Sequence, residues 1–467
     1  MALDALPAEL LCLAATCLPV ASLGQMRLSS YSIWAKTEPV FDNHILQTRW
    51  KVAEDSLATL LQLSREPRFS RKITTIRFST HFLHQFTRPG KESGIVSLWQ
   101  KLLRQQIGFL EGTRPAALLT LIFSQLPLLQ SVEVGEWSSS GRELELGWGG
   151  AKLEKMTGQK LNWCMYHEAP GGERHDERHF YSSTLSQCTH LVLTALAVVG
   201  LPLNSLSFIN LSEHDCIRGV EVPRTPTLDI GSPTAMGLSC AFANLTSLSL
   251  AVEYRHQNRP WAENIDTIHW LRNFLSLMPQ LETLLLASKG IADEFDDDWR
   301  FDAYPEATQS FLQGVHFRRL KSFEFANDSC NGEDLYYFIK AHAESLERLI
   351  LRRIQLRQHG QALRAWRDVF AELGTYRTMQ LRSILLSYLY DGIGPALAFT
   401  TDGAQKCELC RHAPDREDDD IPIFAGNQGT HHTYSSDAGV LPSVPDQLEF
   451  ERTPSPSSTD YGDFEME

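Results

Sequence analysis

The residues that come closest to metal chemistry are two cysteines and three histidines near the end of the chain. Cys407 and Cys410 form a CxxC pair, His412 follows them, and His431 and His432 stand further on. Thiolates and imidazoles are the ligands that Zn²⁺ prefers, and four of them hold it tetrahedrally. A single CxxC is weak evidence, because the second half lacks the spacing of a known zinc site. We therefore predict no metal site and keep a metal-binding regulator as an open alternative.

No other cluster has the order that an ion site or a catalytic site needs. The segment Asp293–Trp299 (DEFDDDW) lacks the glycine and the distal glutamate of a calcium loop. His175–His179 (HDERH) lacks the HExxH order that places a glutamate for water activation. The chain has no phosphate-binding GxxxxGK motif, no GxGxxG after a strand, and no GxSxG nucleophile elbow. Because no nucleophile, base and oxyanion donor can be named together, we predict a non-catalytic protein without a cofactor.

The composition excludes several kinds of partner. The net charge is −14 over 467 residues, with no cluster of Lys and Arg, so we expect no nucleic-acid binding. The nine cysteines are scattered, and Asp4 and Glu9 stand where a secretory signal would be basic, which predicts a reducing compartment, cytoplasmic or nuclear. The longest apolar run, Leu191–Leu201, is too short to cross a bilayer. It predicts a buried helix, and no membrane partner is expected.

The start of the chain has the pattern of short helices. Pro7 suits the beginning of a helix, and Pro19 ends the apolar run that follows it. Two more short helices are predicted after this point, with the apolar pattern continuing past Pro39. Leu11 and Val20 fall off the main apolar stripe of these helices, so the segment holds more apolar surface than one interface can hide. That stripe consists of Leu6, Leu10, Leu13, Cys17 and Leu18.

This segment resembles the F-box motif, in the form found in large families of filamentous fungi. The residues that carry the resemblance are Leu6, Pro7, Glu9, Leu10, Leu18, Pro19, Leu23, Arg27, Leu28, Ser29, Ser30 and Trp34. The resemblance implies a three-helix domain over residues 1–45 that binds the Skp adaptor and, through it, the cullin core of a ubiquitin ligase. The contact residues that it implies are Leu6, Pro7, Leu10, Leu18, Pro19 and Leu23. Ala14 and Cys17 replace larger apolar side chains of the family, which predicts weaker adaptor binding.

A second interpretation of these helices stays open. They could cap a repeat domain and use their apolar faces only for packing within the chain, because terminal repeats need such covers. The protein would then be a repeat scaffold that binds other proteins without any ligase. The two interpretations differ in whether apolar side chains remain accessible once the helices have folded.

A short pattern, apolar-x-x-apolar-x-apolar, recurs along the rest of the chain. In all eight copies both residues after the first apolar position are polar, and in seven copies the second of them is Ser or Thr. The fourth and sixth positions alternate inward on a short strand, while the first position anchors the turn before it. The copies begin at Ile73, Leu129, Leu203, Leu245, Leu281, Leu320, Leu346 and Leu381. Stacking of these copies predicts an α/β fold with a parallel sheet.

The copies resemble the irregular leucine-rich-repeat-like regions that often follow F-boxes. The resemblance implies a solenoid over residues 70–410 that holds a protein target. The intervals between copies range from 26 to 74 residues, whereas regular repeats have about 20–29. Two insertions, Ser138–Ser183 and Glu213–Ser239, are rich in turn-forming and charged residues. They are predicted to be long surface loops, which either carry binding residues or are tolerated without a function.

The pattern ends at about residue 413. Residues 415–467 contain thirteen acidic residues against two arginines, a net charge of −11. So much like charge with so little apolar surface predicts a disordered acidic tail over residues 413–467. Thr453 and Ser455 each precede a proline and are either phosphorylation sites or ordinary linker residues.

Overall fold

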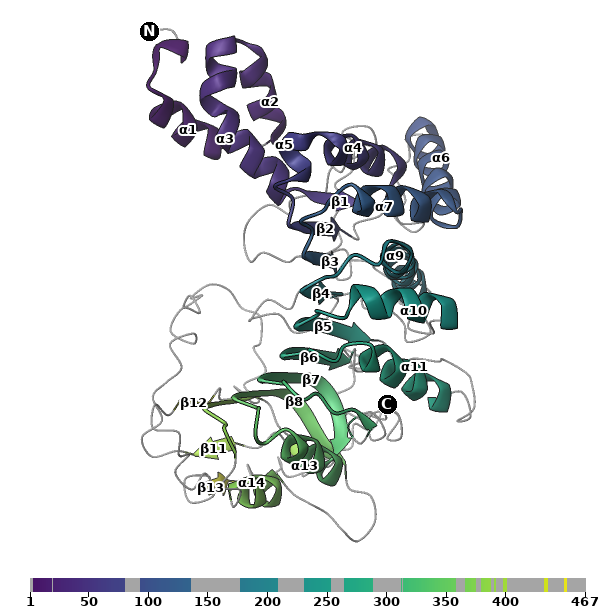
Figure 1. Cartoon of the computed structure of the whole chain (residues 1–467), viewed down its shortest axis with the longest axis vertical. Coiled ribbons are helices and arrows are strands. Elements are labelled where there is room, and N and C mark those ends of the chain that lie inside the picture. The colour runs from purple at the N-terminus through teal and green to yellow at the C-terminus, as the bar shows by residue number, and fades with distance from the viewer. Residues whose placement is uncertain are drawn as a thin grey trace, which may run out of the picture. The chain divides into compact units, whose positions relative to one another are not determined.

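Figure 1 shows a computed structural model of the chain. It describes residues 3–18, 20–79, 93–135, 177–208, 231–252, 264–288, 312, 314–357, 366–374, 379–387, 390–391, 398–400, 432–435 and 449–451. The chain divides into two compact units, unit 1 (Met1–Leu245) and unit 2 (Thr246–Glu467). In both units helices alternate with parallel strands, which confirms the predicted α/β class. Among the described helices, none combines the length and the apolar character that crossing a membrane requires.

Unit 1 begins with three α-helices, as the sequence predicts. They are α1 (Ala8–Thr16), α2 (Val20–Leu28) and α3 (Tyr31–Gln47), and the short turn η1 (Leu3–Ala5) precedes them. Both α1 and α2 pack against α3, which is the longest of the three. Helix α3 continues through Pro39 instead of breaking there. The bundle therefore has α3 at its centre.

Short parallel strands follow the bundle in unit 1. The pairing order is β1, β2, β3 and β4, with Thr75 opposite Ser131 and Ser131 opposite Ser205. In Figure 1 the helices α7, α9 and α10 lie to one side of these strands. The strands are β1 (Arg49–Lys51), β2 (Thr75–Ser79), β3 (Ser131–Gly135) and β4 (Ser205–Ser207). The helices are α4 (Glu54–Arg65), α5 (Pro67–Ser70), α6 (Ser93–Leu110), α7 (Arg114–Ser124), α9 (Glu177–Val199) and α10 (Ser232–Ala241).

Unit 2 repeats this arrangement, and its strands β5 to β8 are longer than those of unit 1. Strands β5 to β9 pair in parallel in chain order, and β12 joins β9 in the antiparallel direction. The strands are β5 (Ser247–Val252), β6 (Thr283–Ser288), β7 (Ser322–Asn331), β8 (Arg348–Arg357), β9 (Ser383–Ser387), β10 (Tyr390–Asp391), β11 (Ala398–Thr400), β12 (His432–Ser435) and β13 (Glu449–Glu451). The helices are α11 (Asn264–Ser276), α13 (Gly332–Ala341) and α14 (Trp366–Gly374). Strand β10 pairs with β8, and β11 pairs with β13.

Every copy of the sequence pattern forms one of the parallel strands. The fourth and sixth residues of all the copies are at most 4% exposed, and the first residues are at most 5% exposed. Three large apolar side chains per copy are thereby removed from water, each contributing about 2 kcal/mol. The predicted parallel strands and their inward positions are confirmed.

A backbone ladder joins successive copies at the turn before each strand. The carbonyl of Thr74, the second residue of its copy, accepts the N–H groups of Gln130 at 2.8 Å and Ser131 at 3.0 Å. The same pair of bonds recurs at the carbonyls of Gln130, Thr246, Glu282, Lys321 and Glu347. These bonds satisfy the turn backbone without the asparagine of regular repeats. The polar side chains at the second and third positions lie along this turn edge.

The predicted loops and tail differ from the structure in part. Helix α9 begins at Glu177, inside the first predicted loop, and α10 overlaps the end of the second, so the loops are shorter than predicted. Residues 136–176 and 209–230, which hold the rest of the loops, lie outside the described residues. The prediction of a buried helix at Leu191–Leu201 is confirmed as far as Val199, where α9 ends; Leu196 is fully buried, whereas Val198 is 69% exposed. Strands β12 and β13 lie within the range predicted to be disordered.

Helix α10 packs on α9 at a glycine, which leads to a prediction about stability. A Cβ added at Gly237 would lie 2.7 Å from the carbonyl carbon and 2.9 Å from the Cα of Ala197. These atoms belong to the helix backbone, which cannot move without disturbing the helix. We expect Gly237→Ala to lower the free energy of unfolding by about 2 kcal/mol, measured by urea denaturation.

A second helical glycine provides the matched control for this substitution. A Cβ at Gly108, in α6, would meet nothing within 4 Å. Gly108→Ala is therefore expected to raise the free energy of unfolding by about 0.5–1 kcal/mol, because alanine has the higher helix propensity. If both substitutions stabilise the protein, α10 does not pack on α9 as closely at Gly237 as the structure shows.

Candidate partner-binding surface

Helix α1 turns an apolar stripe toward solvent. Leu11 and Ala15 are fully buried and face the bundle, whereas Leu10 is 51% and Leu13 66% exposed. Helix α1 has only nine residues, so one contact with α3 occupies one stripe and leaves the other uncovered. The apolar stripe that the sequence predicts, which includes Leu10 and Leu13, is present but faces solvent. Leu11, which lies off that stripe, packs against the bundle in its place.

The residues implied by the resemblance occupy three kinds of position. Leu10 and Pro7 are exposed, and Leu6 and Leu18 are half-buried. Leu23 is fully buried inside the bundle and supports the surface without being part of it. Pro19 lies outside the described residues.

A second apolar group lies where α2 ends and α3 begins. Leu28 and Tyr31 are each 81% exposed, and the rings of Tyr31 and Trp34 stack with their centroids 5.6 Å apart. Large aromatic side chains that are exposed and held in place are typical of the centres of protein interfaces. Leu28 and Trp34 belong to the sequence resemblance, whereas Tyr31 was not identified from the sequence. Its only signal there is its position three residues before Trp34, which puts both rings on one helix face.

Arg27 lies beneath this corner as a buried cation. Its side chain is 6% exposed, and its guanidinium carbon lies 3.9 Å from the ring centroid of Phe41 and 5.4 Å from that of Trp34. Burial lowers the pKa of Arg27, the charge of Arg68 lowers it further, and nearby carboxylates of α3 act in the opposite direction. The cation–π contacts compensate part of the cost of burial and hold the ring of Trp34 from below.

An ion-pair cluster fastens the bundle to the first strands of unit 1. Arg68 Nε and Lys72 Nζ each lie 3.1 Å from Asp42 Oδ2, and Arg68 also pairs with Glu38. Burial by itself raises the pKa of Asp42, but hydrogen bonds from Arg68 and Lys72 outweigh this effect and hold the pKa below its usual value. Asp42 lies on α3, whereas Arg68 and Lys72 lie just before β2. The bundle is thus held at a defined position relative to the strands of unit 1.

No protein-family model matches the chain. A comparison with curated proteins gives no match either. The functional argument therefore rests on the residues that resemble the F-box motif and on the exposed side chains of the bundle.

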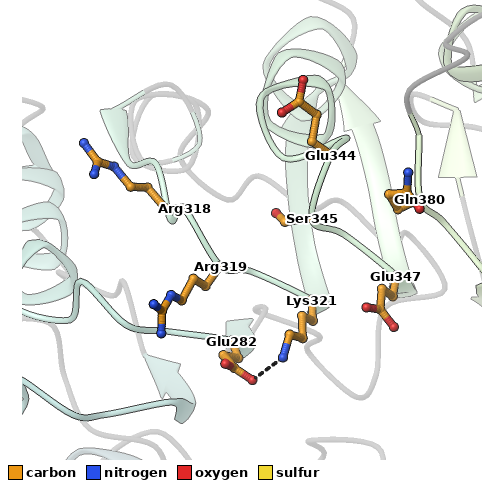
Figure 2. A pocket seen from close by; sticks show the side chains of 8 residues that line it. All are labelled: Glu282, Arg318, Arg319, Lys321, Glu344, Ser345, Glu347 and Gln380. Atoms are coloured by element: carbon orange, nitrogen blue, oxygen red, sulfur yellow. Dashed lines mark hydrogen bonds and ion pairs between the residues drawn. The ribbon is translucent and has the colours of Figure 1, made fainter.

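A pocket of about 490 Å³ lies at the turn edge of unit 2, near the starts of β6 to β9 (Figure 2). Lys321 Nζ lies 2.8 Å from Glu282 Oε2, and Arg382 pairs with Glu347 at 3.6 Å. The three cationic and three acidic side chains in the lining balance, so the pocket favours neither an anion nor a cation. Its residues are Glu282, Arg318, Arg319, Lys321, Glu344, Ser345, Glu347 and Gln380. We interpret it as the charged edge where neighbouring copies pair.

Most of the candidate zinc and calcium ligands lie outside the described residues. Cys407, Cys410, His412 and His431 lie outside the described residues, as does the whole of Asp293–Trp299. Within the part of the chain that is described, no three His, Cys, Asp or Glu side chains gather as a metal site would require. The helical bundle is therefore the site on which the functional argument depends.

Proposed function

We propose that this chain is the substrate-recognition (F-box) subunit of a Skp-cullin-F-box type ubiquitin ligase. The helices α1 to α3 bind the Skp adaptor, and the repeated strands and their loops hold a protein target. The main support is the solvent-facing stripe of α1, where Leu10 and Leu13 are more than half exposed although the helix is packed on α3. Exposed apolar side chains lower the solubility of an isolated monomer. A permanent partner that covers them removes this disadvantage.

In this role the protein performs no bond chemistry. It raises the effective concentration of the target beside a charged conjugating enzyme that the cullin core carries. Its contribution to the rate is therefore geometric, and it is not an enzyme. The spacing between the bundle and the repeats matters for this purpose, and the cluster around Asp42 fastens the bundle to the strands that follow it.

A repeat scaffold without a ligase is the second candidate. The observation that favours it is the same cluster, because Arg68 and Lys72 attach α3 to the residues just before β2, as a cap would be attached to the first repeat. The two candidates differ in the use of the outer face of α1. A cap leaves that face without an occupant, whereas an adaptor-binding helix buries it.

The experiment that separates them is reconstitution with the adaptor. The full chain is co-expressed with a Skp-type adaptor and examined by size-exclusion chromatography and by calorimetric titration. The ligase proposal predicts a one-to-one complex with a Kd in the micromolar range or below, corresponding to at least about 8 kcal/mol of binding free energy. Separate elution of two folded proteins would favour the scaffold.

A further inference from the structure

One lysine of α3 holds the segment that leads into α1. Lys36 Nζ donates hydrogen bonds to the backbone carbonyls of Asp4 and Leu6, both at 2.8 Å. The backbone carbonyl of Lys36 also accepts a bond from the thiol of Cys12, at 3.2 Å. A single residue thus contacts the chain both before α1 and within it.

In the described residues, the segment that leads into α1 has local backbone bonds but no side-chain cap of its own. The N-cap position of α1 is Pro7, and no side chain caps the helix there. Local backbone bonds in this stretch run from the N–H of Leu6 to the carbonyl of Leu3 and from the N–H of Leu11 to the carbonyl of Pro7, at 3.2 and 3.1 Å. The first turn of a helix leaves its N–H groups without intrahelical acceptors, so this end of the helix frays easily. The ammonium of Lys36 is a donor and does not pair with these N–H groups; it holds the carbonyls of Asp4 and Leu6, in the residues that lead into the helix.

The chemistry of the contact favours a lysine. An ammonium is compact, has three donors, and makes charge-assisted bonds to two converging carbonyls. A guanidinium keeps the charge, but it is larger and its donors lie in a fixed planar fork, so it would have to reach the same two oxygens from a different position. We infer that Lys36 is a positioning residue, which sets the place of the Leu3–Pro7 segment and so completes the apolar surface that α1 presents to its partner. The inference rests on the proposed function as far as that partner is concerned.

The test compares Lys36→Met, Lys36→Arg and the control Lys101→Met, which changes an exposed lysine of α6. Hydrogen exchange of the full chain is followed on peptides that cover residues 3–11. We expect exchange there to be about tenfold faster in Lys36→Met, intermediate in Lys36→Arg and unchanged in the control, with α3 unaffected. Binding to the Skp-type adaptor should weaken about tenfold in Lys36→Met and less in Lys36→Arg.

The outcomes separate this inference from the proposed function. Unchanged exchange of residues 3–11 in Lys36→Met overturns the positioning role, whatever the adaptor does. Faster exchange throughout α3 also overturns it, because Lys36 would then maintain the whole bundle. Faster exchange confined to residues 3–11, in a protein whose unsubstituted form fails to bind the adaptor, supports the positioning role and removes the ligase proposal.

Discussion

Replacing Leu10 and Leu13 with aspartate is expected to abolish adaptor binding while leaving the protein folded. Both side chains are more than half exposed, so two carboxylates in their place remain hydrated and disturb little of the core. In a complex the same carboxylates would be removed from water without a partner. Losing the apolar area that these two leucines would bury in the complex corresponds by itself to about 3 kcal/mol of binding free energy, or more than a hundredfold in Kd. Calorimetric titration against the adaptor measures it, and urea denaturation checks the fold.

The matched control is an exposed leucine on another helix. Leu121 of α7 is 45% exposed, close to the value for Leu10, and lies away from the bundle in sequence. Leu121→Asp should leave adaptor binding within about twofold of the unsubstituted protein, since surface changes far from an interface have small effects. Equal weakening by Leu121→Asp and by the α1 double substitution would mean a general loss of structure instead of a lost contact.

The strands were predictable because their pattern has two independent parts. Inward apolar residues at the fourth and sixth positions specify a strand face, and the polar second and third positions belong to the turn edge where the backbone ladder runs. Strand β1 escaped prediction because it has only three residues and lacks the anchor that opens each copy. Pairing with β2 forms it, and such a contact is invisible in a short local window.

The direction of the α1 stripe could not be obtained from periodicity. A helix with apolar residues on two sides has two faces that could pack in the core, and the spacing of its apolar residues does not say which one does. In the structure the buried face holds Ala15, whose small side chain is compatible with a close approach of α1 to α3. Leu11 then enters the core beside it, and the larger stripe with Leu10 and Leu13 is left outside.

Other features depend on residues far apart in the chain. Gly237 of α10 lies against Ala197 of α9. Asp42 pairs with Arg68, which follows the next helix, and Lys36 bonds the carbonyl of Leu6, thirty residues earlier in the chain. None of these residues belongs to a motif. Their roles follow only from packing, which is why the sequence predicts the strands well and the details that hold the surface poorly.

Acid pH is expected to destabilise unit 2 through one buried histidine. His342, at the end of α13, is 1% exposed, and its Nε2 accepts the backbone N–H of Phe317 at 3.0 Å. The proton of the neutral ring is therefore on Nδ1, which donates to the carbonyl of Phe338 at 2.7 Å. Both ring nitrogens have partners in this form. Protonation of Nε2 would place its N–H donor opposite the N–H donor of Phe317, so that hydrogen bond would be lost.

The environment of His342 favours the neutral ring. Its pKa is lowered to about 4: burial is the largest cause, the charge of nearby His316 acts in the same direction, and the hydrogen bond to Phe338 acts in the opposite one. A histidine in the unfolded chain has a pKa of about 6.5. The unfolded state therefore binds more protons between these values, so stability decreases as the pH is lowered through that window. The contribution of about 3 kcal/mol is fully present above about pH 6.5 and is lost as the pH falls through 4.

His342→Gln removes the titration while keeping one donor and one acceptor. We expect the stability difference between the original protein and this variant to shrink by about 2 kcal/mol between pH 7.5 and 4.5, measured by urea unfolding at several pH values. Carboxylates titrate in both proteins, so their effect cancels in the difference. His316→Gln, which changes the exposed neighbour, should follow the original curve much more closely. Parallel curves for the original protein and His342→Gln over this range would contradict a buried neutral imidazole, because a histidine that is equally basic in both states cannot couple folding to pH.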